Sequence, residues 1–254
     1  MIPKVIHYCW FGRNPLPPLV EKCIASWKKL MPDYEIKLWN EDNFDVNINP
    51  YTKEAYKNKK YAFVSDFARF WIIYNYGGIY FDTDVELIKP IDDIISKGAF
   101  MACEKDCIKE LYYPSVAPGL VLAAEKGHTI YKELIEKYNS LSFLNHDGSL
   151  NLKTVDQYTT EILIKHGLKK VFDKIQIVEG INIYPGEYFC PISSVTKRLR
   201  ITENTRAIHI YTATWSNLSF KHNIIRFIRS LLPDSALLWW NEKKRQKQIK
   251  KFEQ

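Results

Sequence analysis

The sequence, 254 residues long, lacks the cysteine pattern of a disulfide framework or a zinc site. Its five cysteines are an odd number, include no CxxC pair and have no further cysteine or histidine at zinc spacing. We therefore expect ordinary thiols, which suit a reducing compartment.

Long apolar runs, internal repeats and low-complexity segments are also absent. No apolar run approaches the ~18 residues of a membrane-spanning helix. The opening MIPKVIHYCWFG lacks the basic, apolar and small-residue sections of a signal peptide, so we expect a cytoplasmic protein. Because 46% of the residues are hydrophobic and 14% are aromatic, the chain can bury a sizeable core, and disorder is not expected.

Excess positive charge is scarce in the body of the chain and concentrated in its tail. Residues 221–254 hold nine Lys/Arg and three Asp/Glu, so they carry +6 of the net charge of +7. Apolar and basic residues recur there at helical spacing, which predicts amphipathic helices on an anionic membrane surface; a helical pair packed on the body is the alternative. A basic tail without a basic domain face argues against nucleic acid. We therefore predict a domain at 1–220 and a tail at 221–254.

The body alternates strand-like and helix-like segments. Strands are predicted at 4–11 and 34–40, and helices at 17–31 and 61–78, the second ended by two glycines. This alternation indicates an α/β fold, in which ligands gather at the carboxyl ends of the strands.

Residues 77–88, GGIYFDTDVELI, are predicted to form one further strand with an unusual pair of acids. A strand places Asp82 and Asp84 on one face with Tyr80 and Glu86, where the like charges repel. A divalent cation would neutralise them, and a solvent-exposed edge is the alternative. In the preceding helix, Asp66 and Arg69 lie three apart among aromatic residues. That spacing fits a surface ion pair, but charges near a core usually have a partner or a ligand.

Five ordered blocks between residues 2 and 215 resemble a known family. SDFAR at 65–69 followed by GGIYFDTD is similar to the signature of retaining sugar-nucleotide transferases with a DXD motif. More narrowly, these blocks, IPKVIHYCWFG, IYPGEYFCPI and TENTRAIHIYTATW resemble family 32 glycosyltransferases of bacterial capsule and lipopolysaccharide synthesis and related eukaryotic mannosyltransferases. The opening is also similar to that of the large clostridial glucosylating toxins. VAPGLVLAAEKGH resembles another family block but lacks its Asn.

The resemblance implies a fold, an activity and a cofactor. The fold would be GT-A, a Rossmann-like α/β domain with a mixed sheet that binds nucleotide in its first half and acceptor in its second. The activity would be retaining transfer of a hexose from a nucleotide sugar, UDP-linked by default, to a glycan acceptor. That acceptor would be lipid-linked, in capsule, O-antigen or lipopolysaccharide synthesis at the inner membrane face. The cofactor would be Mn²⁺ or Mg²⁺.

The resemblance also implies roles for particular residues. Trp10 would stack on the nucleotide base, and Trp215 would lie against the diphosphate. Ser65 would lie near that base, and Tyr80 would line the nucleotide site. Asp66 and Arg69 would bind ribose or donor-sugar hydroxyls, and Asp82 would contact the ribose or, through water, the metal. The metal ligands would be Asp84, Asp82 and His209.

Asp156 and Gln157 resemble the Asp-Gln pair of related retaining galactosyltransferases. They therefore join Asp82, Asp84 and Arg69 as candidate catalytic residues, although an exposed helix start would explain them equally.

Two other functions stay open. A nucleotidyltransferase acting on sugar phosphates would share the fold and the paired acids, but it needs a phosphate loop rich in Gly, Lys and Arg, where this chain has FGRNPLPP. A non-catalytic carbohydrate-binding protein would keep aromatic platforms without metal-dependent nucleotide binding.

Overall fold

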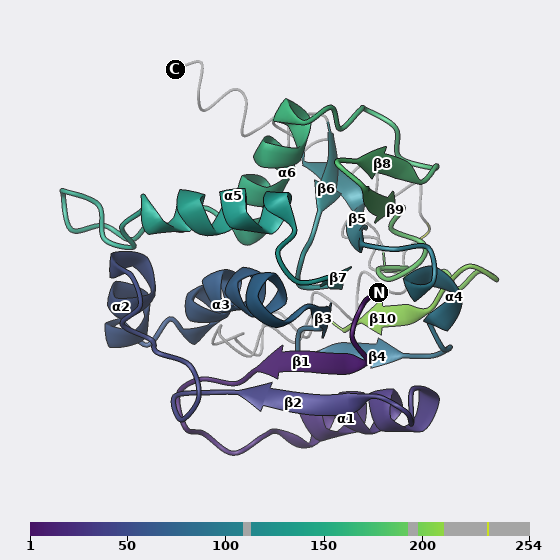
Figure 1. The fold of residues 1–254 in the computed structure, drawn as a ribbon, viewed down its shortest axis with the longest axis horizontal. Coiled ribbons are helices and arrows are strands. Elements are labelled where there is room, and N and C mark those ends of the chain that lie inside the picture. Colours follow the sequence, from purple (N-terminus) through teal and green to yellow (C-terminus); the bar gives the residue numbers. More distant parts are fainter. Residues whose placement is uncertain (109–112, 193–197, 211–232, 234–254) are drawn as a thin grey trace.

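The computed structural model describes residues 1–108, 113–192, 198–210 and 233 of the chain (Figure 1). Within them, a mixed sheet of eight strands runs in the order β2-β1-β3-β7-β5-β9-β8, with β6 paired to β5. A separate antiparallel pair joins β4 to β10. The strands are β1 (Val5–Cys9), β2 (Glu35–Trp39), β3 (Gly78–Tyr80), β4 (Val85–Leu87), β5 (Phe100–Ile108), β6 (Tyr113–Val116), β7 (Leu122–Ala124), β8 (Gln176–Val178), β9 (Ile181–Tyr184) and β10 (Ala207–His209).

The strand directions bring several carboxyl ends to one edge of the sheet. β1 is parallel to both β2 and β3, and β7 runs antiparallel to both β3 and β5. Because β9 is parallel to β5, the strands β1, β2, β3, β5 and β9 all point the same way. Ligand sites of α/β proteins lie at this kind of edge.

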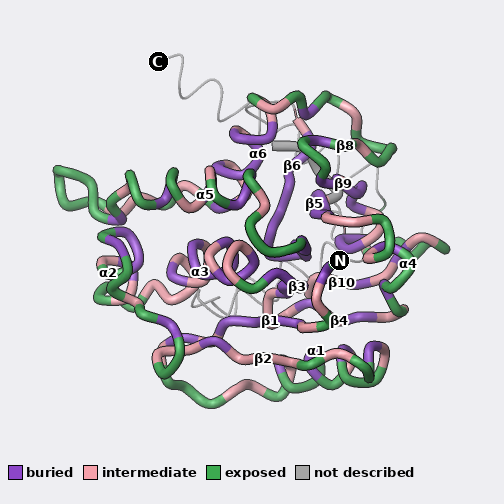
Figure 2. Tube along the Cα trace, viewed as in Figure 1, coloured by how far each residue is buried: buried purple, intermediate pink, exposed green. Residues whose placement is uncertain are grey.

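Helices cover both faces of the sheet (Figure 1). The helices are α1 (Pro18–Leu30), α2 (Pro50–Lys57), α3 (Tyr61–Tyr76), α4 (Asp92–Ile95), α5 (Thr129–Asn139) and α6 (Val155–Lys165). Side chains of α1 and α4 share one buried cluster with β4, whereas α2, α3, α5 and α6 share the other. Figure 2 shows the buried central strands between these layers.

The α/β fold with a mixed sheet is confirmed, and so are four predicted elements. The strands expected at 4–11 and 34–40 are β1 and β2, and the helices expected at 17–31 and 61–78 are α1 and α3. The amphipathic helices expected at 221–254 lie outside the described residues. Among the helices that are described, none has the length and apolarity to cross a membrane.

The prediction of one strand over 77–88 is wrong. β3 ends at Tyr80, the chain turns with the amide of Val85 donating to the carbonyl of Asp82 at 3.1 Å, and β4 begins at Val85. The turn sends Asp82 and Asp84 to different partners, although the charge of Asp84 still contributes, after burial, to the raised pKa of Asp82.

A buried histidine ties β1, β2 and the start of β3 together. His7 is 2% exposed, its Nδ1 accepts a hydrogen bond from the Trp39 indole at 3.0 Å, and its Nε2 donates to the carbonyl of Gly77 at 3.0 Å. A Cβ at Gly78 would lie 2.9 Å from the same Nε2, which explains a glycine there. Burial lowers the pKa of His7 to about 4. His7 is therefore a structural residue.

This histidine should make the fold sensitive to mild acid. The unfolded chain takes up a proton near pH 6.5, whereas folded His7 does so only near pH 4, so its contribution to stability is complete above pH 6.5 and falls as the pH drops to 4. The loss amounts to about 3 kcal/mol. Urea unfolding at pH 7 and pH 4.5 measures it, and His7→Gln should flatten that pH dependence. An unchanged pH dependence in the variant would contradict this role.

Candidate active site

An aromatic residue follows the carboxyl end of β1. The amide of Trp10 donates to the carbonyl of Trp39 at 2.9 Å, and its indole Nε1 donates to the carbonyl of Asn14 at 2.7 Å. The loop between them is tied to the segment after β2, where Glu41 accepts from the amide of Gly12 at 2.6 Å. The indole N–H is thus used to hold its own loop, and the half-buried ring stands beside the strand ends.

One guanidinium organises the centre of the site. Arg69 of α3 is 3% exposed, and its Nη2 lies 3.0 Å from Oδ1 of Asp66 and 3.1 Å from Oδ1 of Asp82. Its Nε donates to the carbonyl of Ser65 at 3.1 Å, and its guanidinium stacks 5.1 Å from the centre of the Tyr80 ring. Arg69 therefore links α3 to the end of β3. Its contact with Asp66 is not the surface ion pair that the spacing alone would allow.

Asp82 is held on three sides. Its Oδ1 also accepts from the Tyr80 hydroxyl at 2.9 Å, and its amide donates to the carbonyl of Gly119 at 3.0 Å. A Cβ on Gly119 would lie 2.1 Å from Oδ2 of Asp82, so the close approach requires glycine. Burial raises the pKa of Asp66 and of Asp82, and Arg69 acts in the opposite direction on both.

Asp84 takes a different partner. Its Oδ1 lies 3.0 Å from Nε2 of His209, and its carbonyl accepts from the amide of Ile210 at 2.9 Å. The pairing of Val85 with His209 in the β4–β10 ladder fixes this contact. The structure thus brings together residues that are 125 apart in the sequence.

The structure unites two of the three predicted metal ligands. Carboxylate oxygens suit Mn²⁺ and Mg²⁺, whose remaining positions are commonly filled by water and substrate phosphates, so Asp84 fits such an ion. Nε2 of His209 lies 3.0 Å from Oδ1 of Asp84, and it would have to give up that contact to bind the ion as well. Asp82 instead directs Oδ1 to Arg69 and Tyr80. No group of three ligating side chains forms among the residues that the structure describes.

Of the remaining predicted residues, some have a structural role and one lies near the candidate site. The hydroxyl of Ser65 donates to the carbonyl of Tyr61 at 3.3 Å, a hydrogen bond within α3. Gln157 forms a capping box with Thr154 at the start of α6, so its side-chain amide stabilises the helix end. Asp156, its neighbour, lies within electrostatic reach of Asp66 and Asp82. Trp215 lies outside the described residues.

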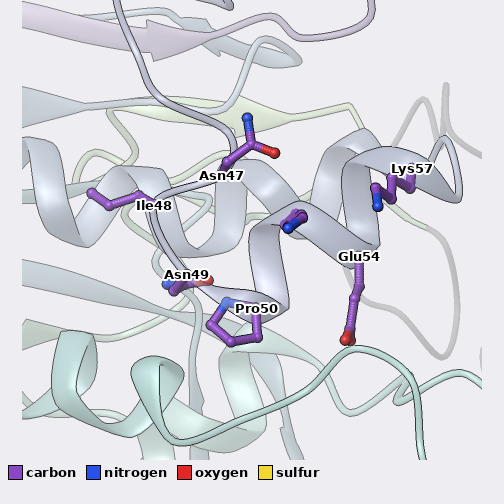
Figure 3. Close-up of a pocket in the computed structure, with 7 residues that line it drawn as sticks. Asn47, Ile48, Asn49, Pro50, Glu54 and Lys57 are labelled. Carbon is purple, nitrogen blue, oxygen red and sulfur yellow. The ribbon is translucent and has the colours of Figure 1, made fainter.

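Two cavities lie away from these acids. One of about 500 Å³ is lined by residues 47–50 with Lys53, Glu54 and Lys57 of α2 (Figure 3). Glu54 already accepts from the amides of Phe143 and Leu144 at 2.8 and 2.9 Å. The other, of about 320 Å³, is lined by side chains of α3 and α5. Neither is lined by a predicted site residue, so both are separate from the candidate site.

Comparisons with known proteins give this geometry a context. Residues 17–101 match the family described as "Glycosyltransferase sugar-binding region containing DXD motif". Inositol phosphoceramide mannosyltransferase 3 of Schizosaccharomyces pombe is 29% identical over 57% of this chain and 39% of its own. An uncharacterized glycosyltransferase of Acanthamoeba polyphaga mimivirus is 34% identical over 41% of this chain and 44% of its own.

The chain thus spans less than half the length of these two relatives. Among solved structures, a glycosyltransferase involved in glycosylation of the major capsid of PBCV-1 is 14% identical, covers 83% of this chain and 95% of its own, and has a TM-score of 0.49. The sequence matches therefore support a glycosyltransferase family for this chain.

Proposed function

We propose that the chain is a metal-dependent glycosyltransferase that moves a hexose from a nucleotide sugar to a glycan acceptor. The observation that carries the proposal is the cluster in which Arg69 holds Asp66 and Asp82 at the end of β3. It lies within the segment that matches the sugar-binding region, and the pair of Asp84 and His209 adjoins it.

The proposed reaction needs no strong protein base. The bond from the anomeric carbon to the diphosphate breaks, the acceptor oxygen bonds to that carbon with retention of configuration, and the hydroxyl proton leaves with the nucleoside diphosphate. Asp84 and His209 would hold Mn²⁺ or Mg²⁺, which when bound offsets the negative charge of the diphosphate. Asp66 and Asp82, fixed by Arg69, would accept hydrogen bonds from ribose or sugar hydroxyls.

Two observations lead to a more specific proposal for the identity of the donor and the acceptor. Trp10, beside the strand ends, suits base stacking, and a UDP-linked hexose is the first donor to test. The name of the fission yeast relative adds mannose and a lipid-borne acceptor as candidates. We place the reaction in the synthesis of capsule, O-antigen or lipopolysaccharide on a lipid-linked glycan.

The released product separates this proposal from its two rivals. A glycosyltransferase releases nucleoside diphosphate from the nucleotide sugar, whereas a nucleotidyltransferase releases or consumes pyrophosphate. A carbohydrate-binding protein releases neither. Coupled assays for both products on UDP-glucose, UDP-galactose and GDP-mannose with Mn²⁺ make the distinction. Pyrophosphate chemistry, or no turnover of any donor, would contradict the proposed activity.

Base stacking by Trp10 is testable through donor kinetics. Trp10→Ala should raise the donor KM roughly 5- to 150-fold, because stacking contributes ~1–3 kcal/mol per base. The kcat should change little, since stacking is equally present in the ground state and the transition state. Trp10→Phe, which keeps an aromatic face, should be much closer to wild type. An unchanged KM in Trp10→Ala would assign the ring to packing alone.

The basic tail is proposed to bind the inner face of the cytoplasmic membrane. Each Lys or Arg near an anionic surface contributes about 1 kcal/mol, and residues 221–254 carry a net +6. Deleting 221–254 should therefore release the protein from vesicles containing phosphatidylglycerol in a sedimentation assay. Equal binding of the full and shortened chains at low and high salt would contradict it.

A further inference from the structure

The loop between α6 and β8 is a compact surface feature that the candidate site does not use. Gln176, the first residue of β8, closes this loop with its side-chain amide. Its Oε1 accepts from the amide of Lys169 at 2.8 Å, and its Nε2 donates to the carbonyls of Lys169 and Val171 at 3.1 and 2.9 Å. Residues 172–175 therefore form the tip of a closed loop.

The tip of the α6–β8 loop exposes large apolar side chains. Phe172 is 41% exposed and Ile175 is 40% exposed, and Ile177 of β8 is 73% exposed just beyond them. In the part of the chain that the structure describes, β8 is the last strand of the sheet, at the opposite end from β2 (Figure 1). Apolar side chains gathered on one exposed segment mark an interaction surface.

The same loop carries an excess of positive charge. Residues 165–175 hold one aspartate, Asp173, and four exposed lysines, Lys165, Lys169, Lys170 and Lys174. Lys170 lies 5.1 Å from the centre of the Tyr113 ring, and none of the four forms an ion pair with a residue that the structure describes. Lysines alone could protect the edge of β8 from pairing with another chain, but that role would not account for an apolar tip.

The sheet register places this loop at the same edge of the sheet as the candidate site. One row of paired residues crosses the sheet from the site to the loop: Tyr80, Leu122, Met101, Ile183 and Gln176. β3 runs toward the edge that holds Asp82 and β8 runs away from it, so the residues after Tyr80 and those before Gln176 lie beyond the same side of that row. The two ends of the row are four strand spacings apart, or roughly 20 Å.

We propose that the α6–β8 loop is a membrane contact that holds an anionic lipid surface beside the candidate site. Phe172 and Ile175 enter the headgroup region, and Lys169 and Lys174 pair with lipid phosphates. The inference rests on the proposed function in one respect, because a lipid-linked acceptor gives a reason for a membrane at this edge. It does not depend on residues 221–254.

Vesicle sedimentation with the full chain tests this contact. Vesicles of phosphatidylglycerol and phosphatidylcholine are compared with vesicles of phosphatidylcholine alone. Lys169→Gln combined with Lys174→Gln should lower the partition coefficient on the anionic vesicles about 25-fold, or about fivefold for each lysine. Phe172→Ser combined with Ile175→Ser should lower it about tenfold or more. High salt should abolish the effect of the lysines and leave the effect of the apolar residues.

Two matched controls lie elsewhere on the molecule. Lys28→Gln combined with Lys29→Gln removes the same charge from the last turn of α1. That variant should change vesicle binding less than about twofold, because charges far from the membrane are screened. Leu152→Ser, which replaces an apolar side chain that is 58% exposed, should have no effect on vesicle binding.

The outcomes separate this inference from the proposed function. Wild-type protein that does not bind anionic vesicles, or loop variants that bind them as the wild type does, would overturn the inference. Loop variants that lose self-association but keep vesicle binding would overturn it too, by assigning the surface to a second copy of the chain. Without vesicles, every variant should release nucleoside diphosphate from soluble donors at the wild-type rate. Wild-type protein that turns over no donor would instead overturn the proposed function. Circular dichroism confirms that each variant is folded.

Discussion

Asp84→Asn is expected to lower the rate of sugar transfer about 10²- to 10³-fold while the fold persists. The substitution replaces a charged oxygen ligand by a neutral amide in the pair with His209, so the proposed cation would be held less tightly. Nucleoside diphosphate release measured across a Mn²⁺ titration checks this, because weakened metal binding shifts the midpoint of that titration upward.

The matched control for this change is Asp33→Asn, which neutralises an acid whose side chain is 79% exposed. That variant should keep the wild-type rate and the wild-type Mn²⁺ midpoint. Full activity of Asp84→Asn in excess chelator would show that the reaction does not depend on a cation at Asp84.

Gly119→Ala should lower the rate of sugar transfer nearly as much as Asp84→Asn. It does so although it adds only one methyl group, at a position far from Asp82 in the sequence. The new Cβ would lie 2.1 Å from Oδ2 of Asp82, so Asp82 or the turn has to move. Overpacking of this kind costs about 1–3 kcal/mol. The displaced carboxylate leaves Arg69 without one of its two acids, and we expect transfer to fall about 100-fold, as for a misplaced substrate-positioning group.

Gly148→Ala separates the steric effect from the general cost of replacing glycine. Nothing lies within 4 Å of a Cβ there, but its φ of +80° penalises alanine. This control should lose some thermal stability and keep its activity. Equal activity of Gly119→Ala and wild type would mean that Asp82 is not positioned by the turn.

Much of the architecture could be predicted from local patterns. The helical spacing of apolar residues in α1 and α3, and the apolar runs of β1 and β2, are each visible within one short segment of the sequence. These elements can therefore be predicted without knowing the rest of the fold. Asp66, Arg69, Asp82 and Asp84 were likewise identifiable, because charged residues set among apolar ones stand out in a sequence. His209 was identified only through the family resemblance.

The geometry that joins those residues could not be read from the sequence. Two acids separated by one residue looked like neighbours on a strand, but they lie in a turn and take different partners, Arg69 of α3 and His209 of β10. These contacts depend on how the chain folds and are not visible in the short segment that holds the acids. Tertiary context overrides strand propensity in this way.

Gly119 was missed for a related reason. A glycine in a turn is common, and this one gains meaning only through the fold that sets it beside Asp82. A useful signal for Gly119 was its place just before β7, since glycine near a buried strand often marks a close backbone approach.

Thermal unfolding with UDP-, GDP- and CDP-sugars, with and without Mn²⁺, tests most directly whether this site binds a nucleotide sugar. A ligand that binds only the native state raises stability in proportion to RT ln(1 + [L]/Kd). One nucleotide sugar should raise the Tm of the wild type in the presence of Mn²⁺, much less in the presence of chelator, and much less in Asp84→Asn. The absence of a shift with every nucleotide sugar, or an equal shift in Asp84→Asn with chelator, would contradict the assignment of this site.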